Sequence, residues 1–488
     1  MTQPQTLGQW ITDAALPEGW QQRPVRPLRL DSRQVQTGDW FVLEQPQHPQ
    51  RQAFVRQALE RGAELIISAE PVADCAVEQQ LVIAGLASRL GEYLARYHGE
   101  PATCMDVIGV TGTNGKTSVT QFIARALESL AKPCALMGTL GYGRVGQLDE
   151  ATHTTPDVLR VHQYLQRFQQ QGCQALAMEV SSHALVQGRV AGVRFRTAVF
   201  TNLTRDHLDF HGTMEAYAAA KQRLFTWPDL AEAVVNLDDP YGRQILQQLP
   251  AGVRPLSYSW GQPEADFHVL EWQPHAQGMA LRLYTPLGEL ALESVLLGRF
   301  NVSNLMAVVA VLYAQGFTLS QIAQAVNNLP RVNGRMESLV VPERPLVVVD
   351  YAHTPDALVQ ALTALRDHVQ GRLWCVFGCG GDRDRGKRPL MAEAVEAHAD
   401  QLVLTQDNPR FEDPEQIISD TLAGFRHPER VQIITDRAKA IASAIAQADR
   451  TDIILIAGKG HETYQDIAGV KHHFSDLDVA RHYLELAP

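Results

Sequence analysis

Cysteine is scarce in this chain, with six residues among 488. Most of them have apolar neighbours, which is typical of a reduced compartment where thiols pack as small hydrophobic groups. Cys375 and Cys379 lie close together, but no second Cys-x-x-Cys or histidine pair accompanies them. We therefore interpret the cysteines as structural residues and not as zinc ligands. The six are Cys75, Cys104, Cys134, Cys173, Cys375 and Cys379.

Long apolar runs are also missing, as is a basic N-terminal segment followed by an apolar one. No run approaches the roughly 18 to 20 residues that cross a bilayer, and the start "MTQPQTLGQWITDAALPEGW" is unlike a secretory signal. We expect a cytoplasmic protein without membrane insertion. The formal net charge of -11 comes without blocks of like charge or Lys/Arg clusters interleaved with aromatic residues. Nucleic acid is therefore not an expected partner.

The chain has the composition of a folded globular protein, with 45% hydrophobic and 20% charged residues. Its length suggests about three domains, at roughly 150 residues each. Residues 1–100 combine short strand signals with a helix-then-strand pattern, "AFVRQALERGAELIIS", which predicts a small α/β domain. The turn-forming stretch "YHGEPATCMD" marks a boundary near residue 100. We place the other two domains at 101–332 and 333–488.

Buried strands recur in the second and third predicted domains. In the second, "DVIGV", "QALAMEV", "TAVFTNL" and "EAVVNLDDP" alternate with helical patterns, which indicates a doubly wound, mostly parallel sheet. Alternating polar and apolar residues between about 255 and 298 predict an antiparallel excursion. The third domain opens its own series with "PLVVVDYAH", and polar clusters follow each strand, as at the ligand-binding edge of Rossmann-like sheets. The predicted fold class is α/β.

The segment "VIGVTGTNGKTSVTQFIARAL" from Val107 to Leu127 reads as a strand, a glycine loop and a helix that begins near Lys116. Backbone N–H groups at a helix N-terminus bind phosphate. In such loops the lysine, here Lys116, binds the phosphates, and the hydroxyl of the next residue, Thr117, binds Mg²⁺. Val110 stands where the usual P-loop has its first glycine. The pattern still favours nucleoside triphosphate binding. The predicted ATP-binding residues are Gly112, Thr113, Asn114, Gly115, Lys116, Thr117 and Ser118.

Five motifs, in order and spacing, resemble the Mur ligase superfamily: "TGTNGKTS", "TTPD", "MEVSSHAL", "NLTRDHLDFHGT" and "GRFNVSN". The later motifs "DNPR" and "AGKGHETYQ" look like the members that add meso-diaminopimelate. The resemblance implies three domains that bind a UDP-sugar, ATP and an amino acid. It implies an ATP-dependent amide ligase of peptidoglycan precursor synthesis. In this reaction the γ-phosphoryl group of ATP activates the D-Glu γ-carboxylate of UDP-N-acetylmuramoyl-L-Ala-D-Glu, and meso-diaminopimelate displaces phosphate from the acyl phosphate.

The resemblance also implies the catalytic residues, which are Lys116, Glu179, His207 and Lys221. Thr117, Glu179, His207 and Lys221 as a carbamate would hold Mg²⁺. We expect Glu179 and His207 at the ends of two neighbouring strands. His207 and His211 have helical spacing, but the glutamate of an HExxH zinc motif is not between them. Judged without the resemblance, Lys221 would be an exposed helix lysine.

Further positions match the family patterns for nucleotide and sugar. Asn301 and Asn304 would face the adenine, although either could equally be a helix N-cap. Arg335 would contact ATP phosphate, and Asp350, on the first strand of the third domain, would contact the ribose or adenine. His153 and the stretch 44–52 depart from the usual pattern on the UDP side. The predicted UDP-sugar-peptide residues are Leu30, Ser32, His153, Thr154, Thr155, Ser181, Gln187 and Arg189.

Diaminopimelate carries a carboxylate and an ammonium at its distal end, whereas lysine carries only an ammonium. A diaminopimelate site should therefore contain a guanidinium fork, which Arg410 and Arg383 can supply. The other predicted residues of this site are Asp407, Asn408, Pro409, Gly458 and Glu462.

Two alternatives stay open at this level. One is another ligase of the superfamily, either lysine-adding or of the folylpolyglutamate type. The other is a P-loop ATPase that regulates or scaffolds without ligation, which would need neither the Glu179–His207–Lys221 set nor a basic pocket in the third domain. The expected partners are the three small-molecule substrates, with ATP as co-substrate, Mg²⁺ as cofactor, and a monomeric protein.

Overall fold

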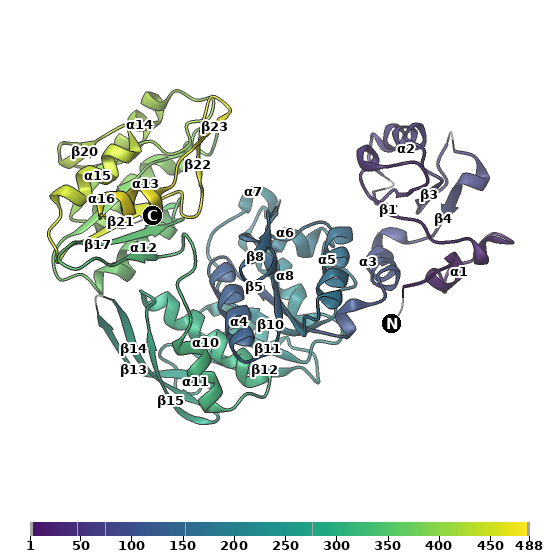
Figure 1. The fold of residues 1–488 in the computed structure, drawn as a ribbon, viewed down its shortest axis with the longest axis horizontal. Helices are drawn as coiled ribbons and strands as arrows, with labels where there is room; N and C mark the ends of the chain where they lie inside the picture. The colour runs from purple at the N-terminus through teal and green to yellow at the C-terminus, as the bar shows by residue number, and fades with distance from the viewer. Residues whose placement is uncertain (1–2, 46, 74, 152, 276, 486–488) are drawn as a thin grey trace. The chain divides into compact units, whose positions relative to one another are not determined.

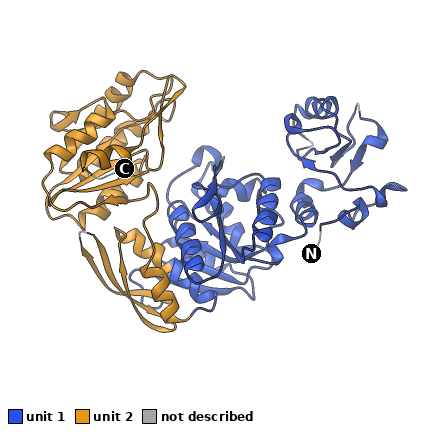
Figure 2. Cartoon of the chain, viewed as in Figure 1, with its two compact units in different colours: residues 1–265, 307–317 blue, residues 266–306, 318–488 orange. Residues whose placement is uncertain are grey.

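The computed structural model describes residues 3–45, 47–73, 75–151, 153–275 and 277–485. Figure 1 shows their helices and strands. The chain divides into two compact units, one within residues 1–265 and 307–317 and one within residues 266–306 and 318–488 (Figure 2). Each unit combines sheets with helices, so the predicted α/β class is confirmed. The predicted domain boundaries near residues 100 and 332 stay predictions.

Unit 1 begins with a small parallel sheet in the order β1-β2-β3-β4. The predicted helix-then-strand signal corresponds to α2 and β3. Trp10 and Trp40 stack with ring centroids 6.0 Å apart in the core beneath this sheet. The elements are α1 (Leu7–Trp10), β1 (Leu28–Arg29), β2 (Trp40–Val42), α2 (Arg51–Glu60), β3 (Leu65–Ser68), β4 (Gln80–Val82) and α3 (Leu86–Tyr97).

The second sheet of unit 1 has the strand order β12-β11-β10-β5-β9-β6-β7-β8. Pairing is parallel from β12 to β6 and antiparallel for β7 and β8. The strands are β5 (Asp106–Thr111), β6 (Cys134–Gly138), β7 (Gly141–Arg144), β8 (Gln147–Asp149), β9 (Ala175–Glu179), β10 (Phe195–Phe200), β11 (Glu232–Asn236) and β12 (Arg254–Ser259). The helices are α4 (Lys116–Ser129), α5 (Val158–Gln170), α6 (Ser182–Val186), α7 (Leu208–His211), α8 (Met214–Gln222) and α9 (Pro240–Gln247).

Strand β5 lies between β9 and β10, and this corrects one prediction. Glu179 ends β9, while His207 follows β10 by seven residues, so the two positions flank β5 instead of lying on neighbouring strands. Apolar runs show that strands exist, but their order in a sheet depends on how the crossover helices pack. The central place of β5 puts the glycine loop at the carboxyl edge of the sheet, where open α/β sheets bind ligands.

Unit 2 starts with the predicted antiparallel excursion, β13-β14-β15. Its main sheet has the order β16-β17-β21-β18-β19-β20 and is parallel except for β16. Asp350 ends β17, so the short strand β16 precedes the one that we expected to be first. The strands are β13 (Phe267–His275), β14 (Gly278–Thr285), β15 (Gly288–Ser294), β16 (Glu337–Leu339), β17 (Leu346–Asp350), β18 (Leu373–Phe377), β19 (Gln401–Leu404), β20 (Val431–Ile433), β21 (Ile453–Ala457), β22 (Tyr464–Ile467) and β23 (Val470–His473).

Helices accompany this sheet in the alternation that parallel pairing requires. None of the helices in the described ranges is long and apolar enough to cross a membrane. Helix α10 carries residues of both units, because the division falls after Met306. The helices are α10 (Arg299–Ala314), α11 (Leu319–Asn327), α12 (Pro355–Arg366), α13 (Lys387–His398), α14 (Pro414–Leu422), α15 (Arg437–Gln447) and α16 (Asp476–Tyr483).

Candidate functional site

The glycine loop of unit 1 connects the end of β5 to Lys116, the first residue of α4, as predicted. Gly112 has a φ of 151°, and a Cβ at this position would lie 1.9 Å from the Thr201 Oγ1 atom. The segment after β10 holds the loop in place. Asn202 O accepts from Thr113 N at 2.8 Å, and Asn202 Oδ1 accepts from Asn114 N at 2.9 Å. Only glycine permits this close approach.

Two lysine side-chain nitrogens converge on the loop. Lys116 Nζ donates to the carbonyls of Gly112 and Thr113, each at 2.9 Å, and Lys221 Nζ donates to the same Gly112 carbonyl at 2.7 Å. Lys221 is only 2% exposed, so the reading of an exposed helix lysine is wrong. It belongs to the inward face of α8 together with Tyr217, whose ring centroid lies 4.4 Å from its Nζ.

Burial is the main reason why the pKa of Lys221 lies well below 10.5. The charge of Lys116 lowers this pKa further, while Asp206 opposes the shift. A lowered pKa increases the fraction of neutral amine, which is the form that reacts with electrophiles.

Glu179 is the central acceptor beside the loop, with an exposed fraction of 1%. Its Oε2 accepts from Thr117 Oγ1 at 3.1 Å and from Thr139 Oγ1 at 3.2 Å, and its Oε1 accepts from Thr139 N at 2.8 Å. The structure therefore brings two predicted Mg²⁺ ligands, Thr117 and Glu179, into contact. Oxygen ligands of this kind suit a hard divalent cation.

His207 caps α7 in a left-handed conformation, with a φ of 53°. Its Nε2 lies 3.3 Å from Asp206 Oδ2, and its ring packs edge-on against that of His183 with centroids 4.9 Å apart. Burial lowers the pKa of His207, although Asp206 opposes the shift. The neutral imidazole is the form that binds metals. The described residues contain no group of three or more His, Cys, Asp or Glu side chains that could hold a metal ion.

Several predicted sugar-peptide residues extend the network around Glu179. Thr155 Oγ1 donates to the Glu179 carbonyl at 2.8 Å and accepts from Ser181 N at 3.2 Å, and Arg189 Nη1 donates to the Thr155 carbonyl at 2.9 Å. Thr154 Oγ1 lies 3.1 Å from Thr139 Oγ1.

Four predicted UDP-side residues lie at other places in unit 1. Gln187 is the C-cap residue that follows α6, and the carbonyl of His153 accepts from the Tyr142 hydroxyl. Ser32 Oγ donates to Gln57 Oε1 at 2.7 Å, and Leu30 immediately follows β1 of the N-terminal sheet.

The remaining predicted ATP residues lie in unit 2. Asn304 Nδ2 donates to Asn301 Oδ1 at 3.0 Å, and Asn301 Nδ2 donates to the Leu297 carbonyl at 2.8 Å. Both asparagines lie inside α10, which begins at Arg299, so neither is an N-cap.

Arg335 and Asp350 lie at the carboxyl edge of β17. The Arg335 guanidinium is 4.9 Å from the Tyr351 ring centroid, and its Nε is a buried donor without a hydrogen-bond partner in the part of the chain that is described. Asp350 accepts from Met336 N at 2.7 Å and from Ala352 N at 2.8 Å. Desolvation raises the pKa of Asp350, and the nearby Arg335 opposes this shift.

The seven predicted amino-acid-binding residues come together in unit 2 at the ends of β18, β19 and β21. The side chains of Arg383 and Arg410 both border Gly380: a Cβ there would lie 3.8 Å from Arg383 Cγ and 3.1 Å from Arg410 Nη1. Asn408 Nδ2 donates to Glu462 Oε2 at 2.9 Å. A Cβ on Gly458 would lie 2.5 Å from Asp407 Oδ2, and one on Gly381 would lie 2.0 Å from the Pro409 carbonyl.

Lys459 was not among the predicted residues, although it lies within the motif "AGKGHETYQ". Its exposed fraction is 0%, and its Nζ donates to Asn408 Oδ1 and to Glu462 Oε2, each at 3.0 Å. Two other residues near the site were also missed, although the sequence pointed to them. Tyr217 lies four residues before Lys221 on one helix, and Thr139 follows β6 at the same sheet edge as Glu179.

A buried ion pair lies beneath the amino-acid site. Arg437 Nε and Nη2 each lie 2.7 Å from an Asp476 oxygen, and both side chains are fully buried. Arg437 also donates to the carbonyl of Gln406 at 3.3 Å and to that of Ala457 at 2.9 Å, directly before "DNPR" and "GKGHE".

Replacing Asp476 with alanine should destabilise this region by about 3 to 5 kcal/mol, because the Arg437 charge would stay buried without its partner. Urea unfolding and hydrogen exchange of the β19 and β21 amides measure this loss. Asp478→Ala, on the exposed face of the same helix, serves as the control and should cost less than about 1 kcal/mol. Equal effects of the two variants would contradict the role of the ion pair.

Comparison with known proteins supports one family. The Mur ligase middle domain matches residues 110–312, and the Mur ligase glutamate ligase domain matches residues 334–460. The chain is 50% identical over 463 residues to UDP-N-acetylmuramoyl-L-alanyl-D-glutamate--2,6-diaminopimelate ligase of Ectopseudomonas mendocina, covering 94% of this chain and 95% of that protein. The chain belongs to the Mur ligase family.

Other relatives of this Mur ligase agree. The enzyme of the same name from Xylella fastidiosa is 49% identical over 462 residues, covering 94% of this chain and 93% of the relative. A solved structure, also of a UDP-N-acetylmuramoyl-L-alanyl-D-glutamate--2,6-diaminopimelate ligase, is 41% identical. It covers 98% of both chains with a TM-score of 0.77. The predicted fold class and the resemblance to Mur ligases are thereby confirmed.

Proposed function

We propose that this Mur ligase joins meso-diaminopimelate to the D-Glu γ-carboxylate of UDP-N-acetylmuramoyl-L-Ala-D-Glu, with ATP as co-substrate and Mg²⁺ as cofactor. One observation carries the proposal. Two arginines and the Asn408–Glu462 pair meet at one sheet edge of unit 2. The name of this ligase, which relatives at about 50% identity bear, agrees with that arrangement. The reaction belongs to peptidoglycan precursor synthesis and takes place in the cytoplasm, with the protein as a monomer.

The phosphate loop supplies the activating half of the reaction. The Lys116 ammonium and the Lys221 amine both donate to the Gly112 carbonyl, so the Lys116 charge lies at the loop, where it would attract an anion. Lys116 would neutralise the transferred phosphoryl group, and backbone N–H groups at the start of α4 would bind its oxygens. Phosphoryl transfer to a carboxylate brings two anions together, so neutralisation and alignment account for most of the catalysis.

Thr117, Glu179 and His207 are proposed to hold Mg²⁺. The Thr117 and Glu179 oxygens, which are in contact, are ligands that this ion prefers, and the resemblance to Mur ligases adds His207. When bound, Mg²⁺ neutralises phosphate charge and aligns the phosphoryl group. Lys221 is proposed to become a carbamate: the ammonium loses one proton, and the neutral amine then attacks CO₂ and releases a second proton. Its burial and lowered pKa favour the neutral amine that this step needs. The Thr154–Thr155–Ser181–Arg189 network would hold the muramoyl peptide beside the Glu179 carboxylate.

In unit 2 the proposed site recognises both charges of the distal end of diaminopimelate. The Arg410 and Arg383 guanidiniums would bind its carboxylate, because a planar fork matches two carboxylate oxygens. Asp407, Asn408 and Glu462 would receive its ammonium. Asn301, Asn304, Arg335 and Asp350 are proposed to bind the nucleotide, and Arg335 brings to this task a buried Nε donor that has no hydrogen-bond partner among the described residues.

The decisive experiment mixes the protein with Mg²⁺, ATP, UDP-N-acetylmuramoyl-L-Ala-D-Glu and meso-diaminopimelate. We expect phosphate release only when all of them are present, and mass spectrometry should show the muramoyl tripeptide. Lysine in place of diaminopimelate tests the lysine-adding alternative. Phosphate release that needs neither the sugar peptide nor an amino acid would favour the regulatory ATPase and overturn the proposal.

A further inference from the structure

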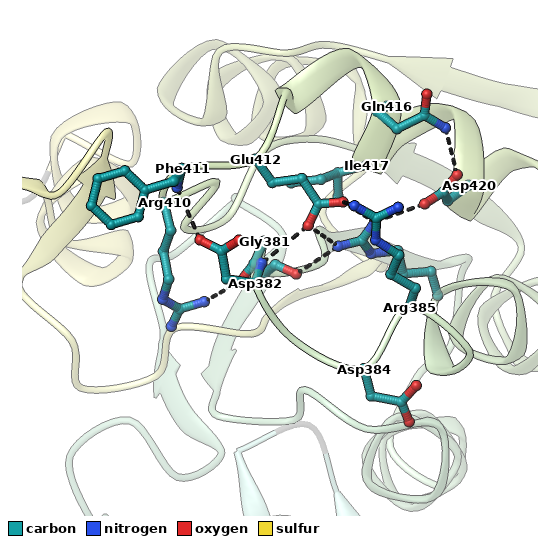
Figure 3. Close-up of polar contacts among 12 residues, drawn as sticks. Gly381, Asp382, Asp384, Arg385, Arg410, Phe411, Glu412, Gln416, Ile417 and Asp420 are labelled. Atoms are coloured by element: carbon teal, nitrogen blue, oxygen red, sulfur yellow. Dashed lines mark hydrogen bonds and ion pairs between the residues drawn. The ribbon is translucent and has the colours of Figure 1, made fainter.

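We propose that the buried ion pair between Arg388 and Glu412 positions the Arg410 guanidinium and thereby sets the selectivity for an amino acid with a distal carboxylate. Figure 3 shows Arg410, Phe411 and Glu412 of one loop beside Gly381 and Asp382 of another. The inference rests on the proposed function and adds two positioning residues to the same site.

Two loops face each other at this place, one after β18 and one after β19. Gly381 N donates to the Asn408 carbonyl at 2.9 Å, and Arg410 Nη1 donates to the Gly381 carbonyl at 2.7 Å. Phe411 N donates to Asp382 Oδ2 at 3.0 Å. The Nη1 atom of Arg410 is therefore held by the loop after β18. The position of the Arg410 guanidinium depends on how the two loops pack against each other.

Both loops contain a residue in an unfavourable backbone conformation. Asp382 has a φ of 51° and Arg410 a φ of 53°, in the left-handed region that side chains other than glycine rarely adopt. Such residues persist only where the surrounding contacts determine their conformation. The local hydrogen bonds between the loops are exposed or half-buried, so a stronger anchor is needed behind them.

Glu412 provides this anchor, two residues after Arg410. The fully buried Arg388 binds it through two parallel contacts, Nη1 to Oε1 at 2.9 Å and Nη2 to Oε2 at 2.7 Å. Glu412 Oε2 also accepts from Asp382 N at 3.0 Å. Glu412 therefore lies in the loop after β19, and its carboxylate binds the loop after β18. Arg388, in the first turn of α13, holds both loops through this carboxylate.

Further contacts show that Arg388 serves this junction. Its Nη2 donates at 3.3 Å to the carbonyl of Gly380, the glycine that the Arg410 side chain borders. Its Nη1 donates to Asp420 Oδ2 at 2.7 Å. The Arg385 guanidinium lies 2.8 Å from Glu412 Oε1. Arg388 holds the pKa of Glu412 down at about 2, so the carboxylate stays charged at the pH of any enzymatic assay.

A double-mutant cycle tests the proposal. Glu412→Gln removes the charge but keeps the shape, and it should raise the KM for meso-diaminopimelate about tenfold while the KM for ATP changes less than twofold. In an Arg410→Ala background the same substitution should change the KM for diaminopimelate less than twofold, because Glu412 acts through Arg410. An equal factor in both backgrounds would overturn the proposal. So would a parallel rise in the KM for ATP.

Asp420→Asn is the matched control, since it removes the charge of another acceptor of Arg388 and leaves Glu412 in place. It should change the KM for diaminopimelate less than twofold, and a change as large as that of Glu412→Gln would count against the inference. If Glu412→Gln does not fold, Arg388→Lys keeps a cation but loses the fork, and the same cycle applies. Wild-type protein that fails to join diaminopimelate would refute the proposed function, whereas wild-type ligation with an additive cycle would refute this inference alone.

Discussion

The Lys221→Ala variant is expected to lose about a thousandfold in kcat, the upper end of the range for removing one preorganised group that stabilises a transition state. Lys221 Nζ is buried and shares the Gly112 carbonyl with Lys116, so it lies beside the place where phosphate is proposed to react. As a carbamate it would turn a cation into an anion that holds Mg²⁺. Steady-state phosphate release with all substrates measures the loss.

Chemical rescue of Lys221→Ala by small carboxylates distinguishes a carbamate role of Lys221 from the role of a simple cation. Alanine leaves space near the Gly112 carbonyl, and acetate or formate should restore part of the turnover of Lys221→Ala. Lys221→Arg keeps the positive charge but cannot form the carbamate, so it should stay inactive. Because the carbamate forms from neutral amine, carbamylation should increase as the pH rises through the lowered pKa of Lys221. Unchanged turnover in Lys221→Ala would remove the catalytic role, and recovery of activity by arginine would argue for a cation.

Arg410→Ala should raise the KM for meso-diaminopimelate by about ten- to a hundredfold, since a hydrogen-bonded contact to a charged group contributes roughly 1.5 to 3 kcal/mol. Arg410 borders Gly380 together with Arg383, and only the amino acid substrate is proposed to bring a carboxylate there. The KM for ATP should change less than twofold. Initial rates at varied diaminopimelate and at varied ATP measure the two constants.

Arg410→Lys provides the control for geometry. It retains a positive charge but loses the planar fork, so its KM for diaminopimelate should lie between those of the wild type and Arg410→Ala. Lysine as substrate should be affected little by either variant, because it has no distal carboxylate. Equal increases in the KM values for ATP and diaminopimelate would contradict the assignment of Arg410.

Local patterns predicted much of this protein correctly. The start of α4 at Lys116, the antiparallel strands β13 to β15 and the parallel strands of unit 2 all follow from short-range signals. These features depend on residue spacing along a single element, which the sequence displays directly. The family motifs likewise marked residues that the structure brings together, such as Asn408 and Glu462.

Other features could not be predicted, for physical reasons. The strand order β10-β5-β9 depends on how crossover helices pack against the sheet, and no single segment encodes it. The short strand β16 has only three residues, too few for a periodic signal. The role of Lys459 as a buried partner of Asn408 depends on a contact between segments 51 residues apart, although its other partner, Glu462, lies only three residues away in the same motif.

By itself, the amino-acid sequence determined the α/β class, the phosphate loop, the family and the types of chemical group that the site contains, because these reside in local spacing and short motifs. Only the tertiary structure decided that Lys221 is buried beside Lys116, that β5 separates Glu179 from the segment of His207, and that Glu412 ties Arg388 to the loop of Arg410. Burial and ion pairing arise between segments that are distant in the sequence. Here burial lowers the pKa of the Lys221 amine, and ion pairing is proposed to orient the Arg410 guanidinium.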